Sequence, residues 1–292
     1  MSHYNLQSYH SPSDLKSALQ LLNKTEESIK IVAGGQSVML LLRQGFLSPD
    51  TFLDISCIPE LSGVSLDKNK ISIGAATTYS SLELSKELQS YSILLDALHV
   101  IADPQIRNLG TIGGALGHAD PSLDIVPPLL CLDSNITLKS LNNTRTISLL
   151  DFHKEYMTAD LLKNELIHSI TFDHLTKNQG GAYEKVANVE GGWPTVGVAA
   201  QVELNEESDI LLDVKIALAA VGDTAIRSNS MEKHLIGSEI SIDSIKKASE
   251  SVPRDIDPID DLSGSAKYKS HLAGVLSQRA LIKAIQRAGG SL

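Results

Sequence analysis

The sequence contains very little cysteine, and this scarcity removes several classes of protein. Among its 292 residues, only Cys57 and Cys131 carry a thiol. Two cysteines cannot ligate an iron–sulfur cluster or complete a four-cysteine zinc site. The nine histidines are scattered, with no H-x-x-x-H pair and no His/Cys cluster. We therefore predict two reduced core thiols, as in a cytoplasmic protein, and no metal site.

An excess of positive charge and a long apolar run are also missing. The formal net charge is −10, and no stretch rich in lysine or arginine interrupts that balance. This argues against a nucleic-acid partner. No segment approaches the roughly 18 apolar residues of a transmembrane helix, and the first residues lack the basic and apolar regions of a signal peptide. We expect a cytoplasmic protein without an integral membrane segment.

The order of the predicted elements indicates an α+β fold. Strands and helices alternate up to about residue 176, beginning with a helix for which Ser11 and Pro12 provide a predicted start. Three longer predicted strands follow, "AYEKVA", "TVGVAAQVEL" and "LLDVKIALAAV", and then two helices. These strands suit one antiparallel sheet. The predicted parts are residues 1–57, 58–176 and 177–292.

Two glycines between a predicted strand and a predicted helix form the first candidate binding element. The stretch "IVAGGQSVMLLLRQG" places Gly34 and Gly35 after the strand and Ser37 near the helix start. Glycine permits positive φ and close approach of backbone to a ligand. Successive N–H groups in such a turn can converge on an anion, and Gln36 adds a side-chain donor. The stretch matches neither G-x-G-x-x-G nor a P-loop, so a plain strand–helix turn is the alternative.

A second stretch, "GTIGGALGHADPSLDIVPP", repeats the design. Gly113 and Gly114 follow the hydroxyl of Thr111, and Asp124 comes ten residues later, in a segment that we predict to be a loop leading into a short helix. A nucleotide with a diphosphate and a sugar-like chain needs backbone donors and a carboxylate acceptor. Two such turns plus an acid suit that need better than one turn alone. His118 in this stretch is interpreted as a structural histidine, and no catalytic residue is predicted.

Together with "GGAYEKVANVEGGWPTVGVAA", these stretches resemble the FAD-binding medium subunit of the molybdenum hydroxylases. The types that match are the medium chain of carbon monoxide dehydrogenase and the FAD domain of xanthine dehydrogenase. The resemblance implies a two-subdomain FAD module of the vanillyl-alcohol-oxidase (PCMH) type, followed by an antiparallel sheet with helices. It also implies a large molybdopterin subunit and a small subunit with two [2Fe–2S] clusters, assembled as a dimer of heterotrimers, in which FAD passes electrons to an external acceptor.

The resemblance also assigns residues by motif. The diphosphate would be contacted by Ala33, Gly34, Gly35, Gln36 and Ser37. The second turn, near the ribityl chain and the diphosphate, would be Thr111, Ile112, Gly113, Gly114 and Ala115. Asp124 would accept from a ribityl hydroxyl. The flavin ring would be flanked by Ile101, Ile167 and, at its polar edge, Lys185.

Some positions depart from the family pattern. Ala115 stands where relatives often carry serine or asparagine, and the loop at Asn188–Gly192 lacks the usual charges. Trp193 covers the flavin or a subunit contact, or it is an aromatic residue packed in the core. Arg107 approaches a phosphate or forms a surface ion pair. A stand-alone FAD oxidoreductase of the same fold and a flavin-free scaffold subunit are therefore the alternative functions.

Overall fold

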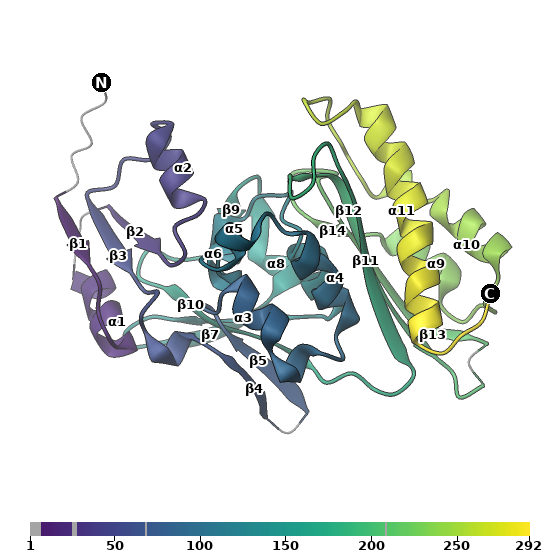
Figure 1. Cartoon of the computed structure of the whole chain (residues 1–292), viewed down its shortest axis with the longest axis horizontal. Helices are drawn as coiled ribbons and strands as arrows, with labels where there is room; N and C mark the ends of the chain where they lie inside the picture. The colour runs from purple at the N-terminus through teal and green to yellow at the C-terminus, as the bar shows by residue number, and fades with distance from the viewer. Residues whose placement is uncertain (1–6, 25–27, 68, 208) are drawn as a thin grey trace.

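The computed structural model describes residues 7–24, 28–67, 69–207 and 209–292. Its parts follow one another along the long axis of the molecule in chain order (Figure 1). A three-stranded sheet lies near the N-terminus, a five-stranded sheet in the middle and a four-stranded sheet near the C-terminus. This mixture of helices and antiparallel strands confirms the predicted α+β class.

The N-terminal part is a small parallel sheet with the strand order β1-β3-β2. Its strands are β1 (Ser8–His10), β2 (Ile29–Val32) and β3 (Thr51–Asp54), and its helices are α1 (Leu15–Lys24) and α2 (Val38–Arg43). The buried face of α1 consists of Ala18, Leu19 and Leu22, at the i, i+1, i+4 spacing of one helix face. These residues pack with Leu53 and Ile55 into a core of their own.

The start of α1 corrects the predicted helix boundary. The helix begins at Leu15 and not next to Ser11. The carboxylate of Asp14 accepts from the backbone N–H of Ser17 at 2.9 Å and from its hydroxyl at 2.7 Å. Asp14 therefore caps the helix, because an aspartate before the first turn satisfies an otherwise free N–H. The serine–proline pair precedes the cap and lies outside the helix.

The middle part is an antiparallel sheet with the order β4-β5-β10-β6-β7. Its strands are β4 (Val64–Asp67), β5 (Lys70–Gly74), β6 (Asn135–Lys139), β7 (Thr144–Ser148) and β10 (Leu166–Asp173), and β8 (His153–Glu155) pairs with β9 (Thr158–Ala159). The segments "NITLKS" and "RTISLL" predict a hairpin around residues 141–144, and the pairing of β6 with β7 confirms it. The helical segments are η1 (Pro59–Leu61), α3 (Tyr79–Leu84), η2 (Lys86–Leu88), α4 (Ser92–Val100), α5 (Pro104–Arg107), α6 (Ile112–His118), α7 (Val126–Cys131) and α8 (Leu149–Phe152).

Helix α6 is a second correction, because this stretch was predicted to be a loop. Thr111 is its cap, and its hydroxyl accepts from the backbone N–H of Gly114 at 3.1 Å. Gly113 donates its N–H to the carbonyl of Ala75 at 2.8 Å, and a Cβ on Gly113 would lie 2.5 Å from the Cβ of Ala75. The glycines therefore serve close packing of a helix turn, which their low helix propensity conceals in the sequence.

The C-terminal part is the predicted antiparallel sheet, with the strand order β11-β12-β13-β14 and with β14 as a strand that was not predicted. Its strands are β11 (Gln179–Ala187), β12 (Pro194–Leu204), β13 (Leu211–Ala219) and β14 (Ile226–Arg227). They are followed by α9 (Asn229–Leu235), α10 (Ile242–Ser249), η3 (Val252–Arg254) and the long helix α11 (Ala266–Arg287). Helix α11 covers one face of this sheet (Figure 1).

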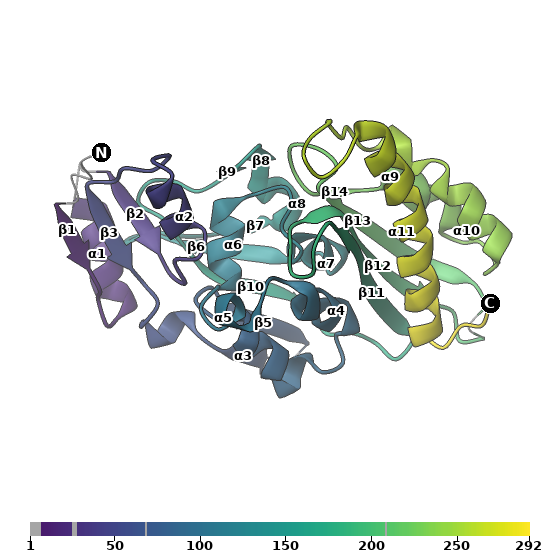
Figure 2. The ribbon, with the colours of Figure 1, turned by 45° about the horizontal axis from the view of Figure 1, so that its top comes forward.

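The other face of the C-terminal sheet packs against the middle part. Alternate residues of a strand point to opposite faces. Ala182 of β11 lies in the core under α11, whereas Tyr183 lies in the core of the middle part together with Ala199 and Ala217. Helices α4 and α7 cover this second face. Helix α6 and strand β10 lie between the N-terminal and C-terminal sheets (Figure 2), where the candidate site is found.

Candidate functional site

A cleft with a volume of about 670 Å3 runs between the parts of the molecule. Its lining residues come from the segments 29–41, 101–124, 157–167 and 191–193, together with Ile55, Ala75 and Tyr79. The volume falls within the range of small-molecule and cofactor sites. Both glycine stretches of the sequence lie in this lining, although they are about 80 residues apart in the chain.

The first glycine turn contacts the second stretch directly. A Cβ on Gly34 would overlap the carbonyl oxygen of Leu109 and lie 2.6 Å from its carbonyl carbon. Gly35 has a φ of 70°, which glycine adopts without strain. The side chain of Gln36 donates to the carbonyl of Gly34 at 2.9 Å. The shape of the turn is therefore set by the positive φ of Gly35 and by a hydrogen bond within the turn. Ala33 and Ser37 also line the cleft.

The second glycine stretch is fixed against the middle part. The N–H of Ile112 bonds the carbonyl of Thr77 at 3.1 Å, and the N–H of Tyr79 bonds the carbonyl of Gly110 at 3.0 Å. Gly114 is exposed in the first turn of α6, where a Cβ would meet only the hydroxyl oxygen of Thr111. Thr111, Gly113, Gly114 and Ala115 line the cleft. The side chain of Ile112 is fully buried and lies outside that lining.

Asp124 joins a buried polar cluster at the floor of the cleft. Its Oδ1 accepts from the hydroxyl of Tyr183 at 2.6 Å, and its Oδ2 accepts from Nζ of Lys185 at 2.9 Å. The Asp124 and Lys185 side chains are each 7% exposed. Burial raises the pKa of the Asp124 carboxyl, and the nearby ammonium opposes that shift. Asp124 lines the cleft, whereas Lys185 is turned away from it and also donates to the Val100 carbonyl at 3.1 Å.

Two isoleucines supply an apolar lining from different elements. Ile101 follows the end of α4 and is 8% exposed, and Ile167 on β10 is 5% exposed. Both line the cleft. Nearly buried side chains that still border a cavity offer flat apolar contact to a ring without a large cost in side-chain entropy.

Sequence reasoning missed the segment 157–165, which also borders the cleft. Arg145 on β7 holds it in place. Its Nε and Nη2 contact the two carboxylate oxygens of Glu165 at 2.8 Å each, and Nη2 also donates to the carbonyl of Asp160 at 2.8 Å. Glu165 is 3% exposed and accepts from the N–H of Leu162 at 3.0 Å. The only signal in the sequence was a lone arginine in a predicted hairpin strand, which is not specific.

This ion pair should make the folding stability of the chain depend on pH in the acidic range. Hydrogen bonding to Arg145 lowers the pKa of Glu165. A lowered folded-state pKa gives stability that is present above the unfolded value of about 4.3 and is lost as the pH falls through the folded value. Glu165→Gln should therefore cost about 1–2 kcal/mol at pH 7 and less at pH 3.5. Urea unfolding at both pH values measures this, and an equal cost at both would contradict it.

The loop between β11 and β12 contributes the last side of the cleft. Gly191, Gly192 and Trp193 line it, and the Trp193 side chain is 55% exposed. Trp193 is therefore not a core residue, so that alternative is wrong. A Cβ on Gly191, whose φ is 71°, would lie 2.9 Å from the carbonyl oxygen of Ala102. The loop thus sits directly on the turn that carries Ile101.

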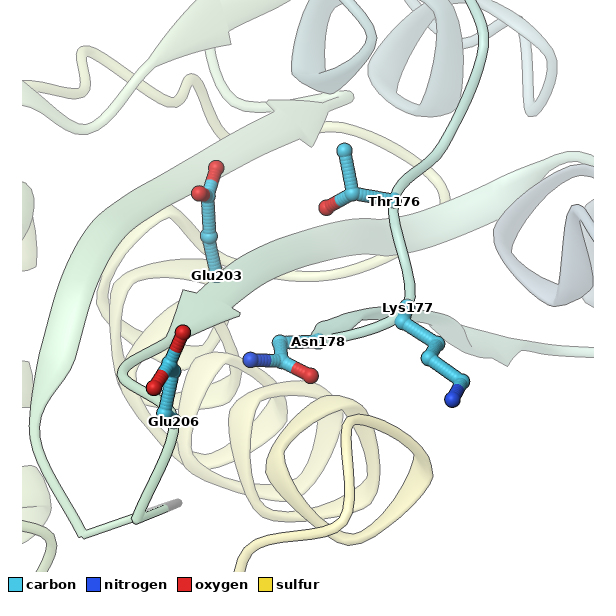
Figure 3. Close-up of a pocket in the computed structure, with 5 residues that line it drawn as sticks. All are labelled: Thr176, Lys177, Asn178, Glu203 and Glu206. Carbon is cyan, nitrogen blue, oxygen red and sulfur yellow. The ribbon is translucent and has the colours of Figure 1, made fainter.

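A second pocket lies on the C-terminal part, away from these elements. It is shallow and polar, and Figure 3 shows the residues that line it: Thr176, Lys177, Asn178, Glu203 and Glu206. None of the residues assigned to a site by sequence lies in it. Among residues 7–24, 28–67, 69–207 and 209–292, no group of three or more His, Cys, Asp or Glu is placed to hold a metal ion.

The cleft suits a flavin dinucleotide. Glycines 34, 35 and 114 leave backbone exposed at the cavity, as a diphosphate requires, whereas Gly113 is buried against Ala75. A carboxylate lies farther along the lining at Asp124, where a hydroxylated chain can donate to it. Ile101 and Ile167 provide apolar surface for a ring. The class that fold and site define together is a flavin-binding protein with a divided binding module.

Comparison with known proteins identifies the family. The model of the FAD binding domain in molybdopterin dehydrogenase matches residues 3–173, and that of the CO dehydrogenase flavoprotein C-terminal domain matches residues 181–284. Subunit alpha of the 6-hydroxypseudooxynicotine dehydrogenase complex of Paenarthrobacter nicotinovorans is 35% identical, over 93% of this chain and 92% of its own. The glyceraldehyde dehydrogenase medium chain of Sulfolobus acidocaldarius is 34% identical, over 94% of this chain and 96% of its own.

A solved structure agrees with these matches. A chain of carbon monoxide dehydrogenase from Hydrogenophaga pseudoflava superposes with a TM-score of 0.93 and 31% identity, covering 97% of this chain and 98% of that chain. The chain belongs to the family of FAD-binding medium subunits of the molybdenum hydroxylases, and it is an oxidoreductase subunit whose cofactor is FAD. The predicted resemblance and the predicted cofactor are thereby confirmed. Within the described part of the chain, no helix has the length and apolar character to cross a membrane.

Proposed function

We propose that this chain is the electron-transfer subunit of a three-subunit complex. It receives electrons from the [2Fe–2S] clusters of a small subunit and delivers them from FAD to an external acceptor, while a large molybdopterin subunit oxidises the substrate. A dimer of such heterotrimers is the proposed assembly. The observation that carries the proposal is the cleft itself, in which both glycine stretches, an acid and two isoleucines surround one cavity.

Each group of lining residues has a proposed task. The backbone of Ala33–Ser37 and the cleft-lining residues Thr111, Gly114 and Ala115 contact the diphosphate, and Asp124 accepts from a ribityl hydroxyl. Ile101 and Ile167 pack on the ring. Lys185 lies behind Asp124, so its proposed task is to keep that carboxylate charged and oriented. The bound flavin accepts single electrons and delivers pairs, while the protein supplies position and electrostatics.

The composition of the chain supports this division of labour. Two cysteines give the chain no ligand set for the clusters, so these belong in partner subunits. Cys131 is buried as predicted, whereas Cys57 is exposed, which corrects the prediction of two core thiols. His118 borders the cleft, where burial lowers its pKa. Among the residues that the structure describes, no carboxylate forms a hydrogen bond with His118 that would make it the base of a stand-alone oxidase. The substrate pocket is therefore assigned to the large subunit.

Purification from the native host with a tag on this chain tests the proposal. The complex should contain two further chains with molybdenum and iron, and it should reduce an artificial acceptor when substrate is added. The isolated chain should bind FAD and fail to oxidise an aldehyde, a purine, an N-heterocycle or carbon monoxide. Turnover by the isolated chain in proportion to its flavin content would establish a stand-alone enzyme, and a colourless chain would establish a scaffold.

A further inference from the structure

The turn that follows helix α4 is held by two cations from other elements. The chain turns through Ile101 and Ala102, and Ala102 has a φ of 46°, in the left-handed region. Nη1 of Arg107 donates to the carbonyl of Ile101 at 2.9 Å and to that of Ala102 at 3.2 Å. Nζ of Lys185 donates to the carbonyl of Val100 at 3.1 Å. A non-glycine residue keeps positive φ where its surroundings fix it, and these donors fix three successive carbonyls.

The same turn borders the cleft and a neighbouring loop. The Ile101 side chain lines the cleft, whereas the Ala102 carbonyl lies against Gly191. A shift of this turn would therefore move the apolar wall of the cleft and the loop that carries Trp193 together. Ile101 follows the last residue of α4 and has extended backbone angles. The turn, and not the helix, therefore determines where the Ile101 side chain lies.

Arg107 is placed to act on this turn and not on a ligand. Its side chain is 15% exposed and it is not part of the cleft lining. Its Nε lies 3.6 Å from Oε2 of Glu83, whose other oxygen pairs with the ring of His99 at 2.8 Å. Of the two predicted alternatives, an ion pair is therefore present, although the guanidinium is largely buried, whereas a phosphate contact does not suit a residue outside the cleft lining. Charge-assisted hydrogen bonds to carbonyls are stronger than neutral ones, so Arg107 is the principal clamp on residues 101–102.

We propose that Arg107 is a positioning residue for the flavin ring. It clamps the carbonyls of Ile101 and Ala102 and so fixes the Ile101 side chain in the cleft wall. The proposal rests on the function proposed above, because that function assigns Ile101 to the ring. Arg107 lies outside the cleft lining, so its effect on the ring passes through the turn.

A matched pair of arginine variants tests this in the full chain. Arg107→Met removes the clamp and keeps the apolar part of the side chain. Arg227→Met is the control, because Arg227 is 14% exposed, binds Glu232 with Nη2 at 2.9 Å and lies in the C-terminal part outside the cleft lining. FAD is titrated into flavin-depleted protein by fluorescence, and the visible flavin spectrum and the melting temperature are recorded.

Arg107→Met should raise the dissociation constant for FAD about tenfold or more, in line with the loss of a charge-assisted hydrogen bond, and should alter the flavin spectrum. Arg227→Met should lower the melting temperature with an unchanged spectrum and affinity. Arg107→Lys, which can reach one carbonyl, should recover part of the affinity. Equal affinity and spectrum in Arg107→Met and wild type would overturn the proposal.

A double-mutant cycle with Ile101→Ala identifies the route of the effect. If Arg107 acts through Ile101, the losses of FAD affinity in the two single variants should not add in the double variant. Additive losses would overturn the positioning role. If Arg107→Met does not fold, Arg107→Lys takes its place in the double-mutant cycle. These measurements need no partner subunit. A chain that binds FAD but receives no electrons would refute the proposed function and leave this test intact.

Discussion

Replacing Gly34 with valine should reduce FAD affinity by about 100-fold or more. A Cβ at this position would overlap the Leu109 carbonyl oxygen and lie 2.9 Å from the Cα of Gly110. These are backbone atoms at the start of the second glycine stretch. Hydrogen bonds from Ile112 to Thr77 and from Tyr79 to Gly110 hold that stretch in place. The added side chain must therefore separate the two halves of the cleft. Overpacking of this kind costs about 1–3 kcal/mol or more, and here the cost falls on the geometry that holds the diphosphate.

Two further glycine variants make this prediction specific. Gly222→Ala is the control, because a Cβ there would have its nearest neighbour at 3.9 Å and Gly222 is outside the cleft lining. Gly114→Ala should have an intermediate effect, since its Cβ would meet only the Thr111 hydroxyl oxygen at 2.7 Å. FAD titration of flavin-depleted variants and circular dichroism provide the measurements. A folded Gly34→Val variant with wild-type affinity would remove the first glycine turn from the proposed site.

Lys185→Met should destabilise the folded chain by about 3–5 kcal/mol at pH 7. Removing one partner of a buried ion pair leaves the other charge uncompensated, and Asp124 is only 7% exposed. Burial already raises the pKa of Asp124, and loss of the ammonium removes the main opposing influence. For an acid whose folded-state pKa is raised, stability is fully present below the unfolded value of about 3.9 and is lost as the pH rises through the folded value. The cost of Lys185→Met should therefore be smaller at pH 4 than at pH 7.

Urea unfolding of two companion variants separates charge from hydrogen bonding. Tyr183→Phe removes the donor to Asp124 Oδ1 without changing charge, so its cost should be about 1.5–3 kcal/mol at pH 7. Because this hydrogen bond also lowers the pKa of Asp124, the cost should fall toward pH 4, but by less than that of Lys185→Met. Lys185→Met combined with Asp124→Asn should regain part of the stability at pH 7, because no charge remains buried. A Lys185→Met variant as stable as wild type at pH 7 would show that the pair contributes nothing to folding.

Patterns that depend on nearby residues could be read from the sequence. The long C-terminal strands, the hairpin of β6 and β7 and the strand–glycine–helix order at Gly34 all follow from local periodicity and turn chemistry. The boundary of α1 was wrong because Ser11 was taken as the cap, whereas Asp14, three residues later, accepts from the first turn. The helical state of the second stretch was hidden for a different reason. Glycine is disfavoured in helices, and only the contact of Gly113 with Ala75 explains its presence there.

Partners that come from distant parts of the chain could not be read in this way. Asp124 and Lys185 were each assigned to the site, but with separate tasks, and nothing local shows that they form one pair. Tyr183 was read only as part of a strand, although its hydroxyl bonds Asp124. The pairing of Arg145 with Glu165 could not be predicted either, because it depends on how β7 and the end of the 157–165 segment meet. The residues of the cleft are thus easier to predict than the residues that hold it.

Tyr183, Ala199 and Ala217 pack into the core of the middle part. This packing bears on whether the C-terminal part could be replaced by that of another protein. The two family models divide the sequence between residues 173 and 181, which suggests two interchangeable modules. The core and the Asp124–Lys185 pair both cross that division. A C-terminal module taken from another lineage would therefore bring a foreign set of core side chains and a foreign partner for Asp124. Substitutions at these contacts on one side of the division should therefore change the cost of substitutions on the other side.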